Sequence, residues 1–254
     1  MNISLFRSVF FSRSHNMKFS LKWAGIPALA LGLMIGTAQQ AEAALLTNGD
    51  FETGDFTGWT KSSATTVIDA TTPLAGTASV VQTGGNGLLR QAFTAQTTPT
   101  TASFIFTATD PGGAADRTMN VYFEQSGSSS NRVNLRLVDR DDDGDGDVEV
   151  FDGAWQLALE NAVTFGEVTS LSLTFNSYGV GANYDLTVGS STATGLTAFQ
   201  NGAPTDFGDI IFVSSSNSAT ATFEFDNVVV PEPSTFLLAV FGGLGLTLLR
   251  RRRK

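Results

Sequence analysis

The sequence contains no cysteine, and its single histidine, His15, lies close to the N-terminus. The lack of cysteine excludes a disulfide framework. The lack of both residue types beyond position 15 excludes a Ser-His-Asp triad, a Cys-His pair and an ordinary zinc site there. Residues 44–230 have only one lysine, Lys61, which leaves little room for Schiff-base chemistry. Paired carboxylates remain available, because glycoside hydrolysis needs only two acids about 5 to 9.5 Å apart.

Basic residues of any kind are scarce in residues 44–230, where six of them face 22 acidic residues and leave a formal charge of −16. Such a surface repels phosphate backbones, so we expect no nucleic-acid partner. An acidic surface also attracts divalent cations. The six basic residues are Lys61, Arg90, Arg117, Arg132, Arg136 and Arg140.

The C-terminal segment has three parts, which are Pro231-Glu232-Pro233, the apolar run Phe236–Leu249 and the basic cluster Arg250–Lys254. Two prolines so close together cannot continue a strand ladder or a helix, so the folded part must end there. The apolar run predicts a transmembrane helix of roughly 21 Å, which is short for about 30 Å of hydrocarbon. The basic cluster holds that end on the cytoplasmic side. A short span suits a temporary anchor, and the alternative is an ordinary tail anchor.

This tail resembles the tripartite C-terminus of PEP-CTERM proteins, which Gram-negative bacteria export and the membrane protease exosortase processes. The resemblance covers Pro231–Lys254. It implies a transient anchor in the inner membrane, exosortase as a partner, and a final location at the cell surface or in the extracellular matrix. The residues that carry the resemblance are Pro231, Glu232, Pro233, Arg250, Arg251, Arg252 and Arg253.

The N-terminal segment predicts a signal peptide over residues 1–43. Met17–Lys22 is basic, Trp23–Gly36 is apolar, and Ala41-Glu42-Ala43 supplies the small residues that signal peptidase reads. We expect cleavage after Ala43, with translation starting either at Met1 or at Met17. The remaining body, residues 44–230, is long enough for one domain with a substantial core.

The body predicts an all-β fold, a two-sheet jelly-roll sandwich. Short segments rich in β-branched and aromatic residues alternate with turn residues, and no segment sustains a helical period. Apolar and polar residues alternate most clearly in Val133–Leu137 and Leu171–Phe175, as each half of a sandwich requires. The predicted strands are Ser79–Gln82, Leu88–Phe93, Ala102–Thr107, Met119–Gln125, Arg132–Val138, Val148–Phe151, Trp155–Leu159, Val168–Phe175, Tyr184–Val188, Asp209–Val213 and Ala221–Val230.

Two kinds of jelly roll resemble parts of this body. Leu46–Trp59 and Phe223–Val230 resemble the first and last strands of carbohydrate-binding domains of the galactose-binding-like type, which pair with each other. That resemblance implies glycan binding and a structural Ca²⁺ held by Glu52 and Asp226. The later half, with Tyr184–Val188, resembles a concanavalin-like jelly roll equally well.

Three aromatic residues, Trp59, Trp155 and Tyr178, are the side chains best suited to stack on sugar rings. The alternative for each of them is a place in the hydrophobic core, where an aromatic ring buries a large apolar area.

The densest charge run, Asp139–Asp147, has six carboxylates, which repel one another unless a cation lies between them. One interpretation is a solvated acidic hairpin tip between Val138 and Val148, and the other is a calcium site. Counted from Asp141, the run fits the Asp-x-Asp-x-Asp-Gly pattern of a calcium loop, although strands rather than helices flank it. The predicted ligands are Asp141, Asp143, Asp145, Asp147 through its carbonyl, Glu149 and Asp152.

Two classes of function therefore remain open. The first is a non-catalytic surface or matrix protein that is associated with exopolysaccharide and binds glycan. The second is a secreted glycoside hydrolase that uses paired carboxylates.

Overall fold

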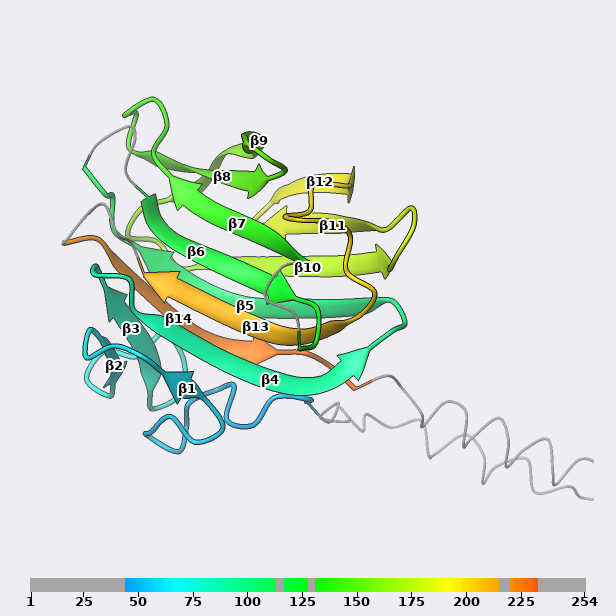
Figure 1. The fold of residues 1–254 in the computed structure, drawn as a ribbon. Helices are drawn as coiled ribbons and strands as arrows, with labels where there is room; N and C mark the ends of the chain where they lie inside the picture. Colours follow the sequence, from blue (N-terminus) through cyan, green and yellow to red (C-terminus); the bar gives the residue numbers. More distant parts are fainter. Residues whose placement is uncertain (1–43, 113–116, 128–130, 215–219, 233–254) are drawn as a thin grey trace, which may run out of the picture. The chain divides into compact units, whose positions relative to one another are not determined.

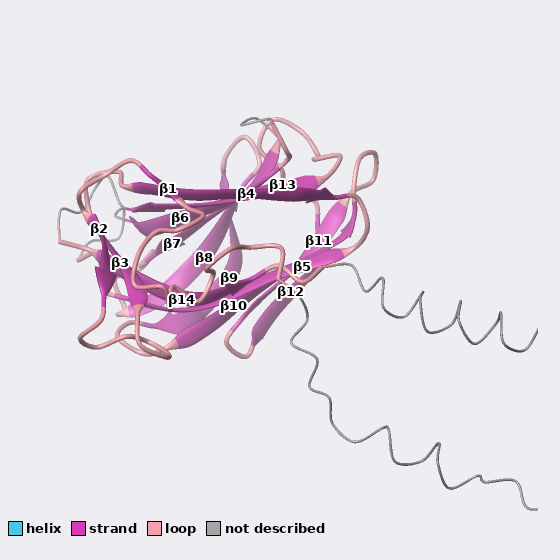
Figure 2. Ribbon diagram, turned by 90° about the horizontal axis from the view of Figure 1, so that it is seen from below, coloured by secondary structure: helices cyan, strands magenta, loops and turns pink. Residues whose placement is uncertain are grey.

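Strands make up all the regular secondary structure that the computed structural model describes, in residues 44–112, 117–127, 131–214 and 220–232 (Figure 1). These residues belong to one compact unit, and they form two antiparallel sheets that pack face to face (Figure 2).

The first sheet has the order β1-β4-β13-β6-β7-β8-β9, and the second has the order β12-β11-β10-β5-β14-β3-β2. The strands of the first sheet are β1 (Thr60–Lys61), β4 (Leu88–Gln96), β13 (Phe207–Ser214), β6 (Arg117–Glu124), β7 (Arg132–Val138), β8 (Asp145–Phe151) and β9 (Trp155–Thr164). Those of the second are β12 (Ser191–Leu196), β11 (Asn183–Val188), β10 (Thr169–Ser177), β5 (Thr100–Ala108), β14 (Thr222–Val229), β3 (Ser79–Thr83) and β2 (Thr66–Asp69).

The hydrophobic core lies between the sheets, because strands of both alternate buried and less buried residues. In β5 the buried positions include Ala102, Phe104 and Phe106, and Phe104 packs edge-on against Phe212 of the other sheet. Phe212 also stacks on Phe225 with ring centroids 3.9 Å apart. Aromatic rings from both sheets thus interlock and exclude water from the interface.

The predicted fold class is confirmed, and each of the eleven predicted strands is present. Strands β1, β2 and β12 were not predicted from the sequence. Strands β1 and β2 are short, and β12 contains no buried residue. Edge strands of this kind bury few apolar side chains, so their hydrophobic alternation is weak.

The segment that resembles an opening strand is not a strand. Residues 45–59 form turns and bends, although backbone hydrogen bonds from Leu45 to Val230 and from Val228 to Gly49, each 2.8 Å long, hold the segment against the end of β14. A Cβ atom on Gly49 would clash with the Val228 carbonyl oxygen. The expected pairing of the two ends is therefore present as two isolated contacts.

The ends of the chain lie outside the described residues, including the predicted signal peptide with Ala43, the apolar run and the residues from Pro233 to Lys254. Within the described ranges, no helix has the length and apolar character needed to span a bilayer.

Candidate functional site

The outward side of the first sheet carries a connected group of polar and aromatic side chains. In β6, Met119, Val121 and Phe123 point into the core, so Asn120, Tyr122 and Glu124 point outward. We call the outward residues of β4, β13, β6, β7, β8 and β9 the outer face. Strand register extends it into rows, because residues directly opposite each other lie on the same side of a sheet.

Three arginine–carboxylate pairs cross the outer face. Arg90 of β4 pairs with Asp209 of β13 at 2.9 Å, and Arg132 of β7 pairs with Glu124 of β6 at 2.6 Å. The third pair joins Arg136 of β7 to Glu149 of β8 at 2.5 Å. All three carboxylates are buried while the arginines are partly exposed, and a buried charge is tolerated only when it is paired in this way.

Two of these arginines also lie over aromatic rings. The Arg132 guanidinium is 4.0 Å from the ring centroid of Tyr122, and that of Arg136 is 4.3 Å from the ring centroid of Trp155. Phe151 packs edge-on against Trp155 at 5.1 Å. Cation–π contact of this kind is worth about 0.5 to 2 kcal/mol. The outer face thus presents the rings of Tyr122 and Trp155, each with an arginine guanidinium group stacked over it.

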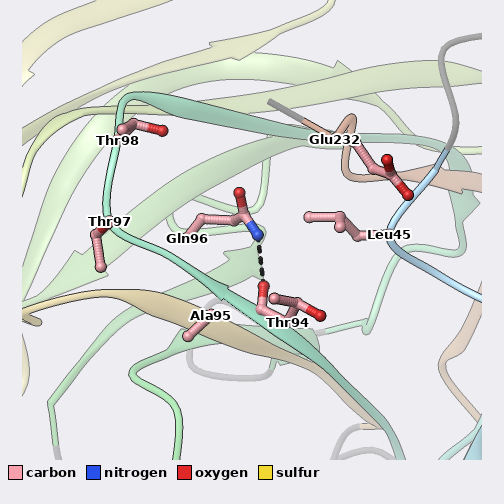
Figure 3. Close-up of a pocket in the computed structure, with 7 residues that line it drawn as sticks. All are labelled: Leu45, Thr94, Ala95, Gln96, Thr97, Thr98 and Glu232. Atoms are coloured by element: carbon pink, nitrogen blue, oxygen red, sulfur yellow. Dashed lines mark hydrogen bonds between the residues drawn. The ribbon is translucent and has the colours of Figure 1, made fainter. Parts of the chain in front are cut away.

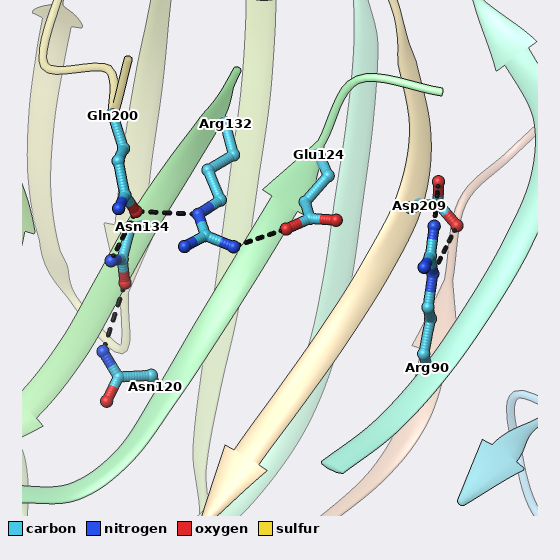
Figure 4. Close-up of polar contacts among 7 residues, drawn as sticks. All are labelled: Arg90, Asn120, Glu124, Arg132, Asn134, Gln200 and Asp209. Atoms are coloured by element: carbon cyan, nitrogen blue, oxygen red, sulfur yellow. Dashed lines mark hydrogen bonds and ion pairs between the residues drawn. The ribbon is translucent and has the colours of Figure 1, made fainter. Parts of the chain in front are cut away.

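A chain of amide side chains continues from Arg132 (Figure 4). Arg132 Nε donates to Gln200 Oε1 at 2.7 Å, and Asn134 Nδ2 donates to the same oxygen at 3.0 Å. Asn120 Nδ2 then donates to Asn134 Oδ1 at 3.1 Å. At the two ends of this arrangement, Asn120 Oδ1 and Glu124 Oε2 are buried acceptors without a hydrogen-bond donor.

The same register places two carboxylates together. Glu124 lies directly opposite Asp209, and Cβ atoms in such positions are about 4.5 to 5.5 Å apart. The sequence alone does not indicate this pair, because the two residues lie on strands that are distant along the chain. The one local signal is the alternation of polar residues through Met119–Gln125, which is typical of a strand with a polar outward side.

The three aromatic residues that were predicted to stack on sugars occupy different places. Trp59 is only 7% exposed, packs against Phe51 and Phe212, and donates its indole N–H to the Asn48 carbonyl oxygen at 3.0 Å. Trp59 is therefore a core residue, which is the alternative that the sequence left open for it. Trp155 is the member of the three that lies on the outer face, beneath Arg136.

Tyr178 follows β10, in the other sheet. Its ring stacks on Phe175 at 5.2 Å, and burial raises its pKa to about 12. Tyr178 packs against the core cluster, so one side of its ring is unavailable to a ligand. The structure does not bring Trp59, Trp155 and Tyr178 together into one stacking platform.

The calcium ligands implied by the galactose-binding-like resemblance both hold the turn before β3. Both Glu52 carboxylate oxygens accept from Thr77, at 2.8 Å from its backbone N–H and 2.7 Å from its hydroxyl. Asp226 accepts the backbone N–H of Ala75 at 3.1 Å. Asp226 is 1% exposed, and burial raises its pKa to about 6, with smaller contributions from the negative charges of Glu52 and Asp50. The structure therefore gathers carboxylates around one turn, where their mutual repulsion contributes to the raised pKa of Asp226.

The first part of the acidic run, residues 139–144, forms the hairpin loop between β7 and β8. Oxygen atoms of Asp139, Asp141 and Asp143 lie within 4.8 Å of one another. The buried Asp139 carboxylate accepts the backbone N–H groups of Asp143 at 3.2 Å and Gly144 at 3.1 Å. Desolvation and the charges of neighbouring acids raise the pKa of Asp141. Asp139 thus supplies the hydrogen bonds that shape this loop.

The calcium register that begins at Asp141 does not close into a loop. Strand β8 already begins at Asp145, and an extended chain from there to Asp152 covers about 23 Å. Asp147 accepts the Asn161 backbone N–H at 2.8 Å, and Glu149 pairs with Arg136. The Glu149 carboxylate is therefore committed to another contact along the sheet, and the extended strand carries Asp152 away from Asp141.

A shallow pocket lies where the two described ends of the chain meet (Figure 3). Ala44 forms an isolated β-bridge with Pro231, and Glu232 faces the turn after β4, where Gln96 donates to the Thr94 carbonyl oxygen at 2.5 Å. The pocket therefore adjoins both predicted processing sites. Its lining consists of Leu45, Thr94, Ala95, Gln96, Thr97, Thr98 and Glu232.

Comparison with known proteins identifies the tail and the fold. Residues 229–254 match the family model of the PEP-CTERM protein-sorting motif, which confirms the predicted tail. No curated protein matches the chain.

Among solved structures, a carbohydrate esterase from the Shiga toxin-encoding bacteriophage phi24B is 14% identical, covers 76% of this chain and 99% of its own, and has a TM-score of 0.56. The carbohydrate recognition domain of Emp47p is 10% identical, with 69% and 88% covered and a TM-score of 0.49. A family 16 carbohydrate-binding module is 12% identical, with 74% and 99% covered and a TM-score of 0.41.

The similarity to the bacteriophage esterase shows a shared fold, because at such low identity no activity is carried over. The motif indicates an exported protein that is sorted through membrane anchoring. The chain therefore combines a PEP-CTERM protein-sorting motif at its C-terminus with a β-sandwich body of the jelly-roll class.

Proposed function

We propose that this is a non-catalytic surface or extracellular-matrix protein whose outer face binds glycan. The observation that carries the proposal is the composition of that face. It combines aromatic rings, planar guanidinium groups and amides on one side of a single sheet, and two buried acceptors there have no donor. Saccharides present C–H surfaces that pack on rings and hydroxyl groups that both donate and accept hydrogen bonds.

The sorting motif sets the route of this proposed protein. Signal peptidase would cut after Ala43, which leaves Ala44 beside Pro231 in the folded domain. Exosortase would then act near Pro231-Glu232-Pro233 while the inner membrane holds the tail. Residues 44–230 would reach the cell surface or the matrix, where an exopolysaccharide is the proposed partner.

Calcium is a proposed structural cofactor at Glu52 and Asp226. The donor set there consists of carboxylate oxygens, which suit a hard divalent cation, and the site has the uncompensated negative charge that such a cation would neutralise. A bound ion would hold the first segment, the turn at Ala75–Thr77 and β14 together. The loop in which Asp139, Asp141 and Asp143 bring carboxylate oxygens within 4.8 Å of one another is a second proposed site.

A glycan array probed with the full chain in mild detergent tests the proposal. We expect binding to at least one polysaccharide, and Trp155→Ala should weaken it by about tenfold, the equivalent of about 1.4 kcal/mol. Phe56→Ala is the matched control, because Phe56 lies 4.7 Å from the Lys61 ammonium in a similar cation–π contact outside the outer face. Equal losses in the two variants, or no bound glycan, would contradict the proposal.

The Glu124–Asp209 pair favours a second candidate, a glycoside hydrolase with paired carboxylates. A retaining glycosidase needs two carboxyl groups about 5 to 5.5 Å apart, and two acids directly opposite each other on neighbouring strands are near enough for such a pair. Each acid is engaged by an arginine, however, which leaves neither as an obvious proton donor, and binding is therefore the preferred proposal. A reducing-sugar assay separates the candidates. Product release by the parent chain that Glu124→Gln and Asp209→Asn each abolish would establish the hydrolase.

A further inference from the structure

The amides of the outer face have only one consistent orientation. Arginine can only donate, so Arg132 requires that Gln200 present its oxygen. Asn134 must then turn its NH₂ group towards that oxygen and its own oxygen towards Asn120. Asn120 must present its NH₂ group in turn, which leaves Asn120 Oδ1 directed away from the chain of amides. The atom of Asn120 without a partner is therefore its oxygen rather than its nitrogen, because Arg132 fixes the orientation of every amide in the chain.

The second unpartnered atom is also an acceptor. Arg132 engages Glu124 through Oε1, and Oε2 has no donor. Glu124 is 1% exposed and Asn120 is 2% exposed, and both lie on β6 on either side of Tyr122. A buried acceptor without a donor loses about 1 to 3 kcal/mol, so a molecule that supplies donors at both positions recovers that loss.

The electrostatic balance of the face points in the same direction. Arg90, Arg132 and Arg136 are each already matched by a carboxylate. Residues 44–230 carry a formal charge of −16, so a negatively charged polymer approaches against the field of the domain.

We propose that the outer face is selective for neutral, hydroxyl-rich saccharides and discriminates against uronate polymers. Hydroxyl groups of the ligand donate to Asn120 Oδ1 and Glu124 Oε2 once the side chains that cover these two atoms move aside, while Arg132 keeps its bonds to Glu124 and Gln200. A carboxylate brings only acceptors to the same positions and meets Glu124 as a like charge. This inference rests on the proposed glycan binding and specifies the class of glycan.

Matched pairs of polymers test the selectivity. Calorimetry on the full chain in mild detergent compares mannan with polymannuronate, galactan with polygalacturonate, and β-glucan with polyglucuronate. We expect at least one neutral polymer to bind and its uronate partner to bind at least about tenfold more weakly. A uronate that binds as tightly as its neutral partner overturns the selectivity but leaves glycan binding intact. No binding to any of the six overturns the proposed function itself.

Two variants then locate the effect. Asn120→Ala removes one open acceptor without changing any charge, and Glu124→Gln places an amide where the second acceptor lies. Each should weaken binding of the neutral polymer by about tenfold or more, because a hydrogen bond in a buried site is lost. Asp185→Asn on β11 is the matched carboxylate-to-amide control and should bind as the parent does. Urea unfolding of each variant shows whether the sandwich is intact. A folded Asn120→Ala variant with parental affinity refutes the proposed contacts.

Discussion

Asp226 should make the stability of this protein depend on pH. Without calcium the free energy of unfolding should rise as the pH falls, and with calcium bound it should fall as the pH falls. Its carboxylate is buried, and its pKa is raised to about 6 from a usual value of 3.8, first by burial and then by Glu52 and Asp50. A raised folded-state pKa means that Asp226 contributes stability at low pH and loses that contribution as the pH rises through about 6. Lowering the pH should therefore protonate the buried carboxylate and raise the free energy of unfolding.

The magnitude follows from the shift. At pH 5 the folded carboxyl is about one unit below its pKa while the unfolded one is still largely ionised, so the gain relative to pH 7.5 is about 1.4 kcal/mol. Calcium at Glu52 and Asp226 would favour the ionised form and remove this gain. At a hundredfold excess over its Kd, calcium would add about 2.7 kcal/mol at neutral pH and would be released as the pH falls.

Urea unfolding of the full chain at both pH values, in chelator and in millimolar Ca²⁺, measures these differences, and Asp226→Asn is the test variant. Asparagine keeps only one of the two acceptor oxygens that bond Ala75 and Asn227, which costs about 1 kcal/mol at either pH and so cancels from the comparison. The variant should lose both the pH increment in chelator and the calcium increment. Identical pH responses in the parent and the variant would refute the electrostatic reasoning. Equal parental unfolding midpoints in calcium and in chelator would refute the metal site.

Three further predictions concern the packing of the first segment and the tail. Trp59→Ala should destabilise the domain by about 3 to 5 kcal/mol in urea unfolding, because a buried aromatic ring is removed from the core. Gly49→Ala should cost about 1 to 3 kcal/mol in the same measurement, since its Cβ would clash with the backbone of Val228, and an unchanged midpoint would contradict this contact. Intact-mass analysis of surface material should find a chain that ends near Pro231–Pro233, whereas a variant with neutral residues at Arg250–Arg253 should accumulate as precursor; mature protein that retains the basic cluster would show a plain anchor instead.

Sequence alone was sufficient for the features that depend on local composition. The tail has an order of prolines, apolar residues and arginines that a membrane and a protease meet as a linear segment, so no tertiary contact is needed to recognise it. Strands such as β7 and β10 were predicted because one apolar side must face the core, which imposes a period of two on the sequence.

The acidic loop is a place where the local sequence pattern was not sufficient to predict the structure. Spacing from Asp141 satisfied a calcium motif, but the motif assumes that the chain keeps turning after position 145. Pairing of β8 with β7 and β9 instead extends the chain from Asp145 onward. Ladder hydrogen bonds along seven residues outweigh any local preference for a loop, and only the tertiary structure shows them.

Tertiary structure alone decided the composition of the outer face. Glu124 meets Asp209, and Gln200 meets Arg132 and Asn134, because strands far apart in the chain become neighbours in one register. Tertiary packing also decides that Trp59 is buried against Phe51 and Phe212 while Trp155 lies under Arg136. Alternation of apolar and polar residues indicates that a strand has two different sides, but it does not indicate which strand pairs with it in the sheet. That choice depends on how the two sheets share one core, which is a property of the whole chain.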